Sequence, residues 1–223
     1  MSEIQYVLSP TASDVGFPVQ RLLPAAQVRA VGPFVFFDHM GPAGFARAGT
    51  VGDVRPHPHI GLATVTYLYT GALIHRDSLG SVQRIEPGAI NLMAAGRGIV
   101  HSERVPADIR AGQRPVHGIQ IWLALPAEHD EMAPAFHHYP AEALPAVAAA
   151  GVALRVLIGA AFGQISPVVA YSPTLQIDAE LAAGVGLELP PDYPERGVYL
   201  VEGRLCVAGT PLEPGQLAVL TPG

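Results

Sequence analysis

Glycine and proline recur along the whole sequence and divide it into short apolar runs. There are 24 glycines and 22 prolines among 223 residues. The runs between them, such as residues 64–69 and 119–125, are rich in β-branched, aromatic and leucine side chains. Short runs of this kind bounded by turn residues are typical of strands, whereas glycine and proline disfavour long helices. The sequence therefore predicts an all-β protein, either a sandwich or a barrel.

The sequence also contains an internal repeat. Residues 65–73 resemble residues 197–205, and the Ile-Glu-Pro-Gly of residues 85–88 resembles the Leu-Glu-Pro-Gly of residues 212–215. Two copies of strand, glycine turn, strand and Glu-Pro-Gly predict two domains of one fold. We expect an N-terminal domain at residues 1–133 and a C-terminal domain at residues 134–223. The second repeat stops soon after its Glu-Pro-Gly, which predicts an incomplete C-terminal domain.

Two pairs of ligand-type side chains lie in the first repeat: His57 with His59, and His101 with Glu103. Residues two apart on a strand point to the same face, so each pair would present both side chains together. Three imidazoles and one carboxylate suit a first-row transition metal. The second repeat has Asp-Tyr-Pro-Glu at residues 192–195 where the first has its histidine pair, so the metal site is expected in the N-terminal domain alone. The alternative is that each histidine is only a polar residue on the barrel surface.

Longer stretches around these residues resemble the pirin family, whose members are bicupins. The most specific are His-Pro-His-Ile-Gly at residues 57–61 and Gly-Arg-Gly-Ile-Val-His-Ser-Glu at residues 96–103, and residues 34–39, 64–68 and 117–122 add to them. The resemblance covers nearly the whole chain in order. It implies two antiparallel β-barrels of the cupin, or jelly-roll, type that lie face to face, with the C-terminal barrel lacking the segment that normally completes it.

The resemblance further implies one mononuclear metal in the N-terminal barrel. The metal of the family is usually iron, so Fe(II) is expected and other divalent metals are possible. The family's ligands fall on His57, His59, His101 and Glu103. Many pirins carry a glutamate shortly after the histidine pair, where this chain has Ala63. Glu103 is then the only candidate carboxylate ligand.

Two functions follow from the resemblance. Family members include flavonol (quercetin) 2,3-dioxygenases, so the first is an Fe(II)-dependent dioxygenase that acts on a small aromatic substrate such as a flavonol. In this reading Glu103 is also catalytic, as the acceptor of the proton from the flavonol hydroxyl. The second is a non-catalytic, metal-dependent regulatory protein with a protein partner, because pirins in some organisms act as transcriptional cofactors or bind metabolic enzymes.

Neighbouring runs supply candidates to support the ligands or to line a pocket. Residues 119–125 alternate so that Gln120 and Trp122 share one face while Ile119, Ile121 and Leu123 share the other. Each candidate has an alternative role inside the barrel, as a hydrogen-bonded polar residue or as core packing. The full set is Phe36, Thr64, Thr66, Met93, Gln120 and Trp122.

Charge and sequence composition exclude several other classes. The net charge is −6 and there is no basic run, so direct nucleic-acid binding is not expected. All 13 basic residues are arginine, which excludes Schiff-base chemistry on a lysine.

The single cysteine, Cys206, cannot form an internal disulfide, and the N-terminus lacks a signal segment. Residues 143–162 are the most apolar window, but Pro145 and Arg155 interrupt it. A cytoplasmic protein without a membrane segment is expected.

Overall fold

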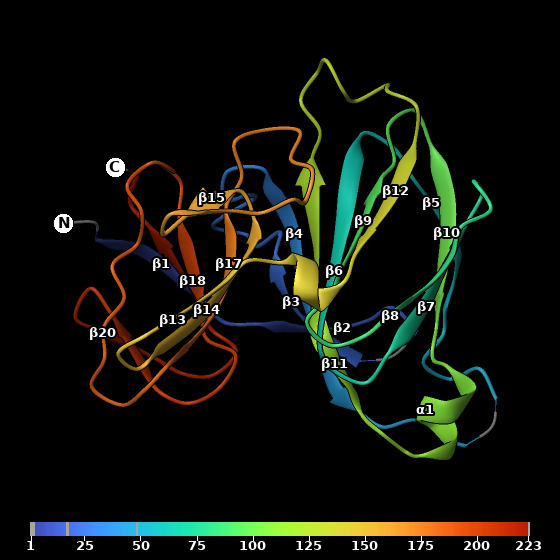
Figure 1. Cartoon of the computed structure of the whole chain (residues 1–223), viewed down its shortest axis with the longest axis horizontal. Helices are drawn as coiled ribbons and strands as arrows, with labels where there is room; N and C mark the ends of the chain where they lie inside the picture. Colours follow the sequence, from blue (N-terminus) through green and yellow to red (C-terminus); the bar gives the residue numbers. More distant parts are fainter. Residues whose placement is uncertain (1–2, 17, 48, 223) are drawn as a thin grey trace.

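A computed structural model describes residues 3–16, 18–47 and 49–222, and antiparallel β-sheet dominates it (Figure 1). Its helical elements in these ranges are the short helix α1 (Ala107–Ala111) and the 3-10 turn η1 (Ala141–Ala143). No helix within the described ranges is long and apolar enough to cross a membrane. The expected all-β class is confirmed.

The N-terminal half consists of two sheets that pack against each other. Leu68 and Val116 of the larger sheet share a buried cluster with Leu73 and Ile85 of the smaller one. Both sheets are open, so the half is a jelly roll of two packed sheets and not a barrel with continuous hydrogen bonding. The larger sheet has the order β12 (Ala135–Tyr139), β9 (Ile90–Ala94), β6 (Leu62–Thr70), β11 (Val116–Ala124), β4 (Phe34–Ala43), β3 (Pro18–Leu23) and β2 (Thr11–Asp14). The smaller sheet has the order β5 (Val54–His59), β10 (Ile99–Arg104), β7 (Leu73–Asp77) and β8 (Val82–Ile85).

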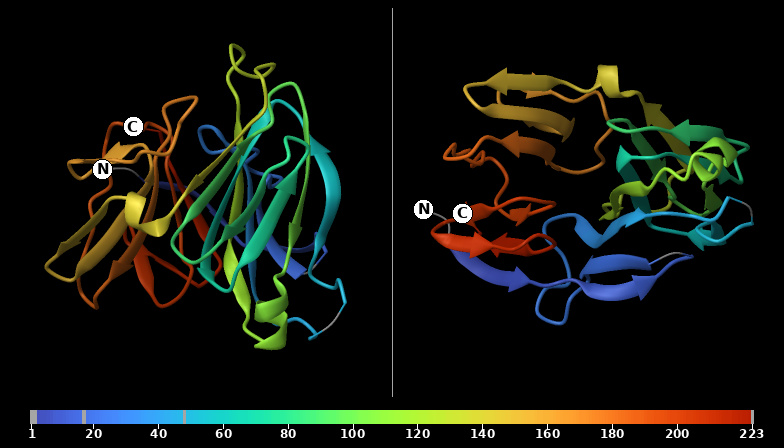
Figure 2. Two further views of the ribbon diagram at one scale, coloured as in Figure 1. Left: turned by 45° about the vertical axis from the view of Figure 1, so that its right-hand side comes forward. Right: turned by 90° about the horizontal axis from the view of Figure 1, so that it is seen from below.

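The C-terminal half is built from smaller sheets, which lie beside the larger sheet of the N-terminal half (Figure 2). Two of them have three strands and two are two-stranded ribbons. The three-stranded sheets are β1 (Ile4–Leu8), β21 (Leu217–Leu220) and β18 (Gly197–Tyr199), and β13 (Ala146–Ala149), β14 (Val152–Ile158) and β17 (Gln176–Leu181). The ribbons are β15 (Ala160–Ala161) with β16 (Gln164–Ile165), and β19 (Leu205–Val207) with β20 (Thr210–Leu212).

The central strands of the larger N-terminal sheet are largely buried on both faces, and alternation along them separates two environments. On one face Val65, Leu92 and Ile121 pack against Leu157 of the C-terminal half. On the other face Gln120 reaches the smaller sheet, where its amide contacts Glu103. The predicted alternation of residues 119–125 is thus confirmed, and it directs polar and aromatic side chains toward the space between the two N-terminal sheets.

Two strands pair with sheets on the other side of the expected boundary between residues 133 and 134. β1, from the start of the chain, lies among the strands of the C-terminal half (Figure 1). It pairs with β21, where Leu8 lies opposite Leu217. β12, from beyond the boundary, pairs with β9 in the N-terminal half, where Phe136 lies opposite Met93. Each half therefore takes one strand from the other side of the predicted boundary.

Candidate metal centre

Three histidines converge at one end of the smaller N-terminal sheet. His57 and His59 share a face of β5, and His101 on the adjacent strand β10 lies opposite His57 in the antiparallel register. The Nε2 atom of His59 is 3.0 Å from that of His57 and 3.1 Å from that of His101, and the Nε2 atoms of His57 and His101 are 3.1 Å apart. The three nitrogens thus form a nearly equilateral triangle.

This triangle fits a cation and does not fit a hydrogen-bonded cluster. A neutral imidazole nitrogen carries either a proton or a lone pair, so the three contacts cannot all be hydrogen bonds. A first-row metal ion binds imidazole nitrogen at about 2.0–2.1 Å; at that distance two ligands at right angles are about 2.8–3.0 Å apart, and two at the tetrahedral angle about 3.3–3.4 Å. The observed N–N distances of 3.0–3.1 Å are closer to the value for two ligands at right angles, as on one face of an octahedral site. The predicted convergence of the three histidines is therefore present, with a geometry suited to a transition metal.

Hydrogen bonds and burial keep lone pairs available at these nitrogens. The Nδ1 of His57 lies 2.8 Å from the carbonyl oxygen of Arg55, which can only accept, so Nδ1 carries the proton and Nε2 the lone pair. The pKa of His59 is lowered to about 4 by burial and by the neighbouring His101 and His57. The pKa of His101 is lowered to about 3, again by burial first and then by His57. The neutral form, which binds metals, is thus favoured at neutral pH for His59 and His101.

Glu103 lies two residues after His101 and is also buried. Its Oε2 accepts a hydrogen bond of 2.8 Å from Nε2 of Gln120, and its Oε1 accepts one of 3.2 Å from Oγ1 of Thr66. Among the described residues, the imidazoles of His57, His59 and His101 form a group whose ligand atoms all lie within 4.8 Å of one another, and Glu103 is not part of it. The structure thus leaves the Glu103 carboxylate outside the histidine group, and two polar neighbours hold it there.

A largely apolar pocket of about 630 Å³ opens over the histidines. His57 and His59 contribute to its lining, and Trp122 forms part of its wall. The Trp122 ring is stacked on Phe36 with centroids 3.9 Å apart. The remaining lining residues are Pro58, Ile60, Leu62, Ser78, Gly98, Ile99 and Val100. A flat apolar ligand in this pocket would contact His57 and His59.

Four of the six predicted supporting residues lie at the site, and two do not. Thr66 and Gln120 contact Glu103, and Phe36 and Trp122 stack beside the pocket. Thr64 is buried on β6, and among the described residues its side chain makes no hydrogen bond to His57, His59, His101 or Glu103. Met93 is buried in a small apolar cluster with Ala95, Ile99 and the adjoining Phe136. Its position corresponds to the alternative of core packing.

His75 and Asp77 were not predicted, although they lie directly behind the histidines. The Nδ1 of His75 is 3.4 Å from the Nδ1 of His101, and the Nε2 of His75 is 2.9 Å from Oδ2 of Asp77. Burial alone would raise the pKa of Asp77, but hydrogen bonds from His75, Ser81 and Leu79 lower it below its ordinary value. The sequence signal was available, because the two residues repeat the spacing of two that identified the ligand pairs.

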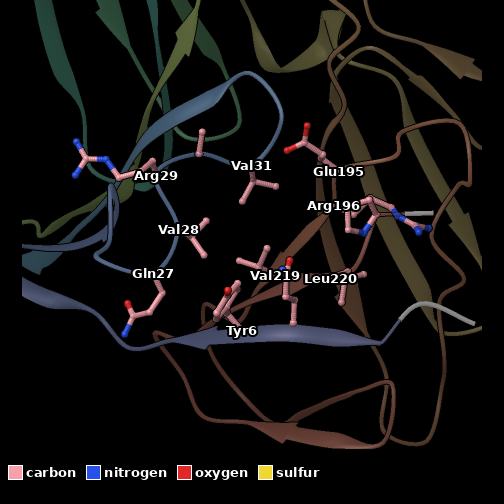
Figure 3. A pocket seen from close by; sticks show the side chains of 12 residues that line it. Tyr6, Gln27, Val28, Arg29, Val31, Glu195, Arg196, Val219 and Leu220 are labelled. Carbon is pink, nitrogen blue, oxygen red and sulfur yellow. The ribbon is translucent and has the colours of Figure 1, made fainter.

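A second hollow, of about 350 Å³, lies between residues 27–31 and the strands β1 and β21 (Figure 3). Val28, Val31, Val219 and Leu220 surround it, while the guanidinium groups of Arg29 and Arg196 point in opposite directions (Figure 3). The charged groups do not converge on this hollow, so the histidine cluster is the stronger candidate for a functional site.

Comparisons with known proteins agree on one family. The family model described as Pirin matches residues 16–123. A pirin-like protein of Caulobacter vibrioides is 47% identical over 99% of this chain, which spans 77% of that relative. A Pseudomonas aeruginosa protein, whose assignment as a quercetin 2,3-dioxygenase is provisional, is 43% identical over 93% of this chain, which spans 64% of that relative.

Solved structures share the fold as well. The crystal structure of a quercetin 2,3-dioxygenase from Acinetobacter baumannii superposes with a TM-score of 0.88 and 36% sequence identity. The match covers 98% of this chain and 72% of that one. The cupin fold predicted from the sequence is thus confirmed, and both halves of the chain take part in the match.

Proposed function

Because the chain belongs to the pirin family, we propose that it is a metal-dependent dioxygenase that opens the central ring of a flavonol such as quercetin. The observation that carries the proposal is the triangle of Nε2 atoms, with edges of 3.0–3.1 Å, two of whose histidines line an apolar pocket. The related proteins named for quercetin dioxygenation support the substrate class.

His57, His59 and His101 would hold the metal, for which we propose Fe(II). Bound there, the ion would supply redox chemistry and a Lewis acid for the oxygens of the flavonol. Three imidazoles would leave coordination positions of such an ion free for other ligands, which distinguishes a reactive site from a closed structural one. The apolar wall formed by Ile60, Leu62 and Trp122 would exclude water and orient the flat rings of the substrate.

We assign to Glu103 the acceptance of the proton from the flavonol hydroxyl. The hydrogen bonds from Gln120 and Thr66 fix the position of its carboxylate, which is the first requirement for a general base. Turning this carboxylate toward the three imidazoles would make Glu103 a fourth ligand, with loss of the hydrogen bond from Gln120.

A second candidate function is the binding of a protein partner, controlled by the metal. Ile60 and Val100, which line the pocket, have relative exposures of 69% and 45%, and the neighbouring Leu79 has 50%. Exposed apolar side chains grouped around a site are common in interaction surfaces. The same metal centre would then shape a surface instead of performing a reaction.

One experiment separates the two functions. The protein is reconstituted anaerobically with Fe(II), the bound iron is quantified, and oxygen and quercetin are then added. A dioxygenase should remove the flavonol absorbance, and His101→Ala should abolish this loss. His137→Ala, on β12 and outside the histidine cluster, serves as the control. Full iron occupancy without loss of absorbance would refute the enzymatic proposal and favour partner binding.

A further inference from the structure

His101 is held from behind by two buried residues of the adjacent strand. β7 pairs with β10 so that Asp77 lies opposite His101 and His75 opposite Glu103. His75 is 4% exposed and the Asp77 side chain is fully buried. The ring of Phe136 stacks on the ring of His75, with centroids 4.2 Å apart and an angle of 12° between the planes. The three polar side chains form a line: Asp77, His75, His101.

The chemistry of this line determines which nitrogen of each ring carries its proton. A carboxylate only accepts hydrogen bonds, so the Nε2 of His75, at 2.9 Å from Asp77, must donate. The Nδ1 of a neutral His75 then has a lone pair. It faces the Nδ1 of His101 at 3.4 Å, so the His101 Nδ1 carries the proton that completes the line. The lone pair of His101 is therefore on Nε2, where it points into the triangle.

We propose that His75 and Asp77 are positioning residues of the metal centre, which fix the tautomer and the ring orientation of His101. The inference rests on the proposed metal site, and it concerns residues that hold a ligand without touching the metal. Partners of this kind are a general requirement for histidine ligands. For His57, the backbone carbonyl of Arg55 fixes the tautomer and the ring orientation instead.

The second oxygen of Asp77 connects this line to the rim of the pocket. Asp77 Oδ1 accepts hydrogen bonds from the backbone N–H groups of Leu79 at 2.9 Å and Ser81 at 3.0 Å. Within the same turn, Ser78 donates its backbone N–H to the carbonyl of Val100 at 2.8 Å, and both of these residues line the pocket. One carboxylate thus shapes the rim of the pocket and orients a ligand histidine.

These contacts make Asp77→Asn an informative substitution. The two backbone N–H donors require an acceptor, so the amide oxygen must take the place of Oδ1 and the NH₂ group must face His75. His75 would then accept at Nε2 and carry its proton on Nδ1. That proton would point at the Nδ1 of His101, which would have to move its own proton to Nε2 and lose the lone pair needed for the metal.

The test is a double-mutant cycle on metal affinity, measured with cobalt(II) by competition with a chelator. Asp77→Asn and His75→Leu should each weaken cobalt binding by about 10- to 100-fold. The double variant should be no weaker than His75→Leu alone, because the aspartate acts through the histidine. Asp108→Asn, an exposed carboxylate paired with Arg84 and Arg114, should leave the affinity unchanged. Affinity within twofold of wild type in Asp77→Asn, or an undiminished effect of this change in the His75→Leu background, would overturn the proposal.

Long-range ¹H–¹⁵N spectra of the metal-free protein provide a readout that a purely structural role would not change. Wild type should show His101 protonated on Nδ1, and Asp77→Asn should move that proton to Nε2. The wild-type spectrum decides the matter if Asp77→Asn does not fold, because His101 protonated on Nε2 would refute the proposal. Failure of wild type to bind cobalt or iron would count against the proposed function, whereas the spectrum would still test the positioning of His101.

Discussion

The rings of Trp122 and His59 meet in a T-shaped pair, with centroids 4.9 Å apart and an angle of 76° between the planes. The same indole stacks on Phe36, so it lies between a ligand histidine and a residue of β4. The indole nitrogen is buried and has no hydrogen-bond partner among the described residues. The ring therefore acts through its shape and its aromatic surface.

This arrangement predicts different outcomes for two substitutions of Trp122. Trp122→Phe keeps an aromatic ring and removes an N–H that is not hydrogen-bonded, so the free energy of unfolding should fall by less than about 1.5 kcal/mol. Trp122→Ala should cost about 2–4 kcal/mol, because it leaves a cavity beside Phe36 and His59. Urea denaturation of the metal-free proteins measures both values, and equal losses would contradict the role assigned to the ring.

Gly96 explains why the motif before His101 requires glycine. Its φ is +49°, and a Cβ atom there would lie 2.1 Å from the carbonyl oxygen of Met132. Its own carbonyl accepts the backbone N–H of Gly61 at 2.8 Å, just after the His57–His59 pair. Gly96→Ala should therefore destabilise the protein by about 2 kcal/mol or more and weaken metal binding. Gly163→Ala is the control, since φ there is +72° with nothing within 4 Å, and it should lose only about 1 kcal/mol with normal metal affinity.

The stability of the metal-free protein should decrease with acid, in part because of His39. Burial, and then the adjacent His117, lower the pKa of His39 to about 4 from its ordinary 6.5. Between these values the unfolded chain binds more protons than the folded one, so stability is full above about pH 6.5 and is lost as the pH falls toward 4. His39→Gln should make the free energy of unfolding depend less steeply on pH, with a change in slope of at most about 1.4 kcal/mol per pH unit. Denaturation across this pH range measures the slope, and an unchanged slope would exclude His39 as a contributor.

A structural feature of this protein can be predicted from the sequence when it depends on residues that lie close together in the chain. The spacing of two that joins His57 to His59 fixes their shared face, and the alternation around Gln120 follows from the same geometry. By contrast, the pairings of β1 with β21 and of β12 with β9 join segments whose partners no local pattern specifies. The line from Asp77 to His101 likewise depends on the pairing of β7 with β10. The convergence of the three histidines could thus be predicted from spacing, whereas the contact of His75 with His101 follows only from the strand order.

Bound metal should be retained under mildly acidic conditions and released in stronger acid. The low pKa values of His59 and His101, about 4 and about 3, mean that protons compete poorly for their Nε2 atoms near neutrality. We expect iron to stay bound at about pH 6 and to be lost on approaching about pH 4. Iron analysis after anaerobic desalting at decreasing pH gives the profile, and release near pH 6.5, where an ordinary histidine titrates, would contradict it.

Glu103→Gln separates proton transfer from metal binding. The substitution keeps the size of the side chain but removes the group proposed to accept the flavonol proton, while the three histidines remain in place. We expect kcat for quercetin to fall by about 100-fold or more, with bound iron within about twofold of wild type. The control is Glu86→Gln, which changes an exposed carboxylate on a surface turn and should alter neither value. Parallel loss of iron and activity in Glu103→Gln would instead identify Glu103 as a required fourth ligand, and normal activity with normal iron would remove it from the mechanism.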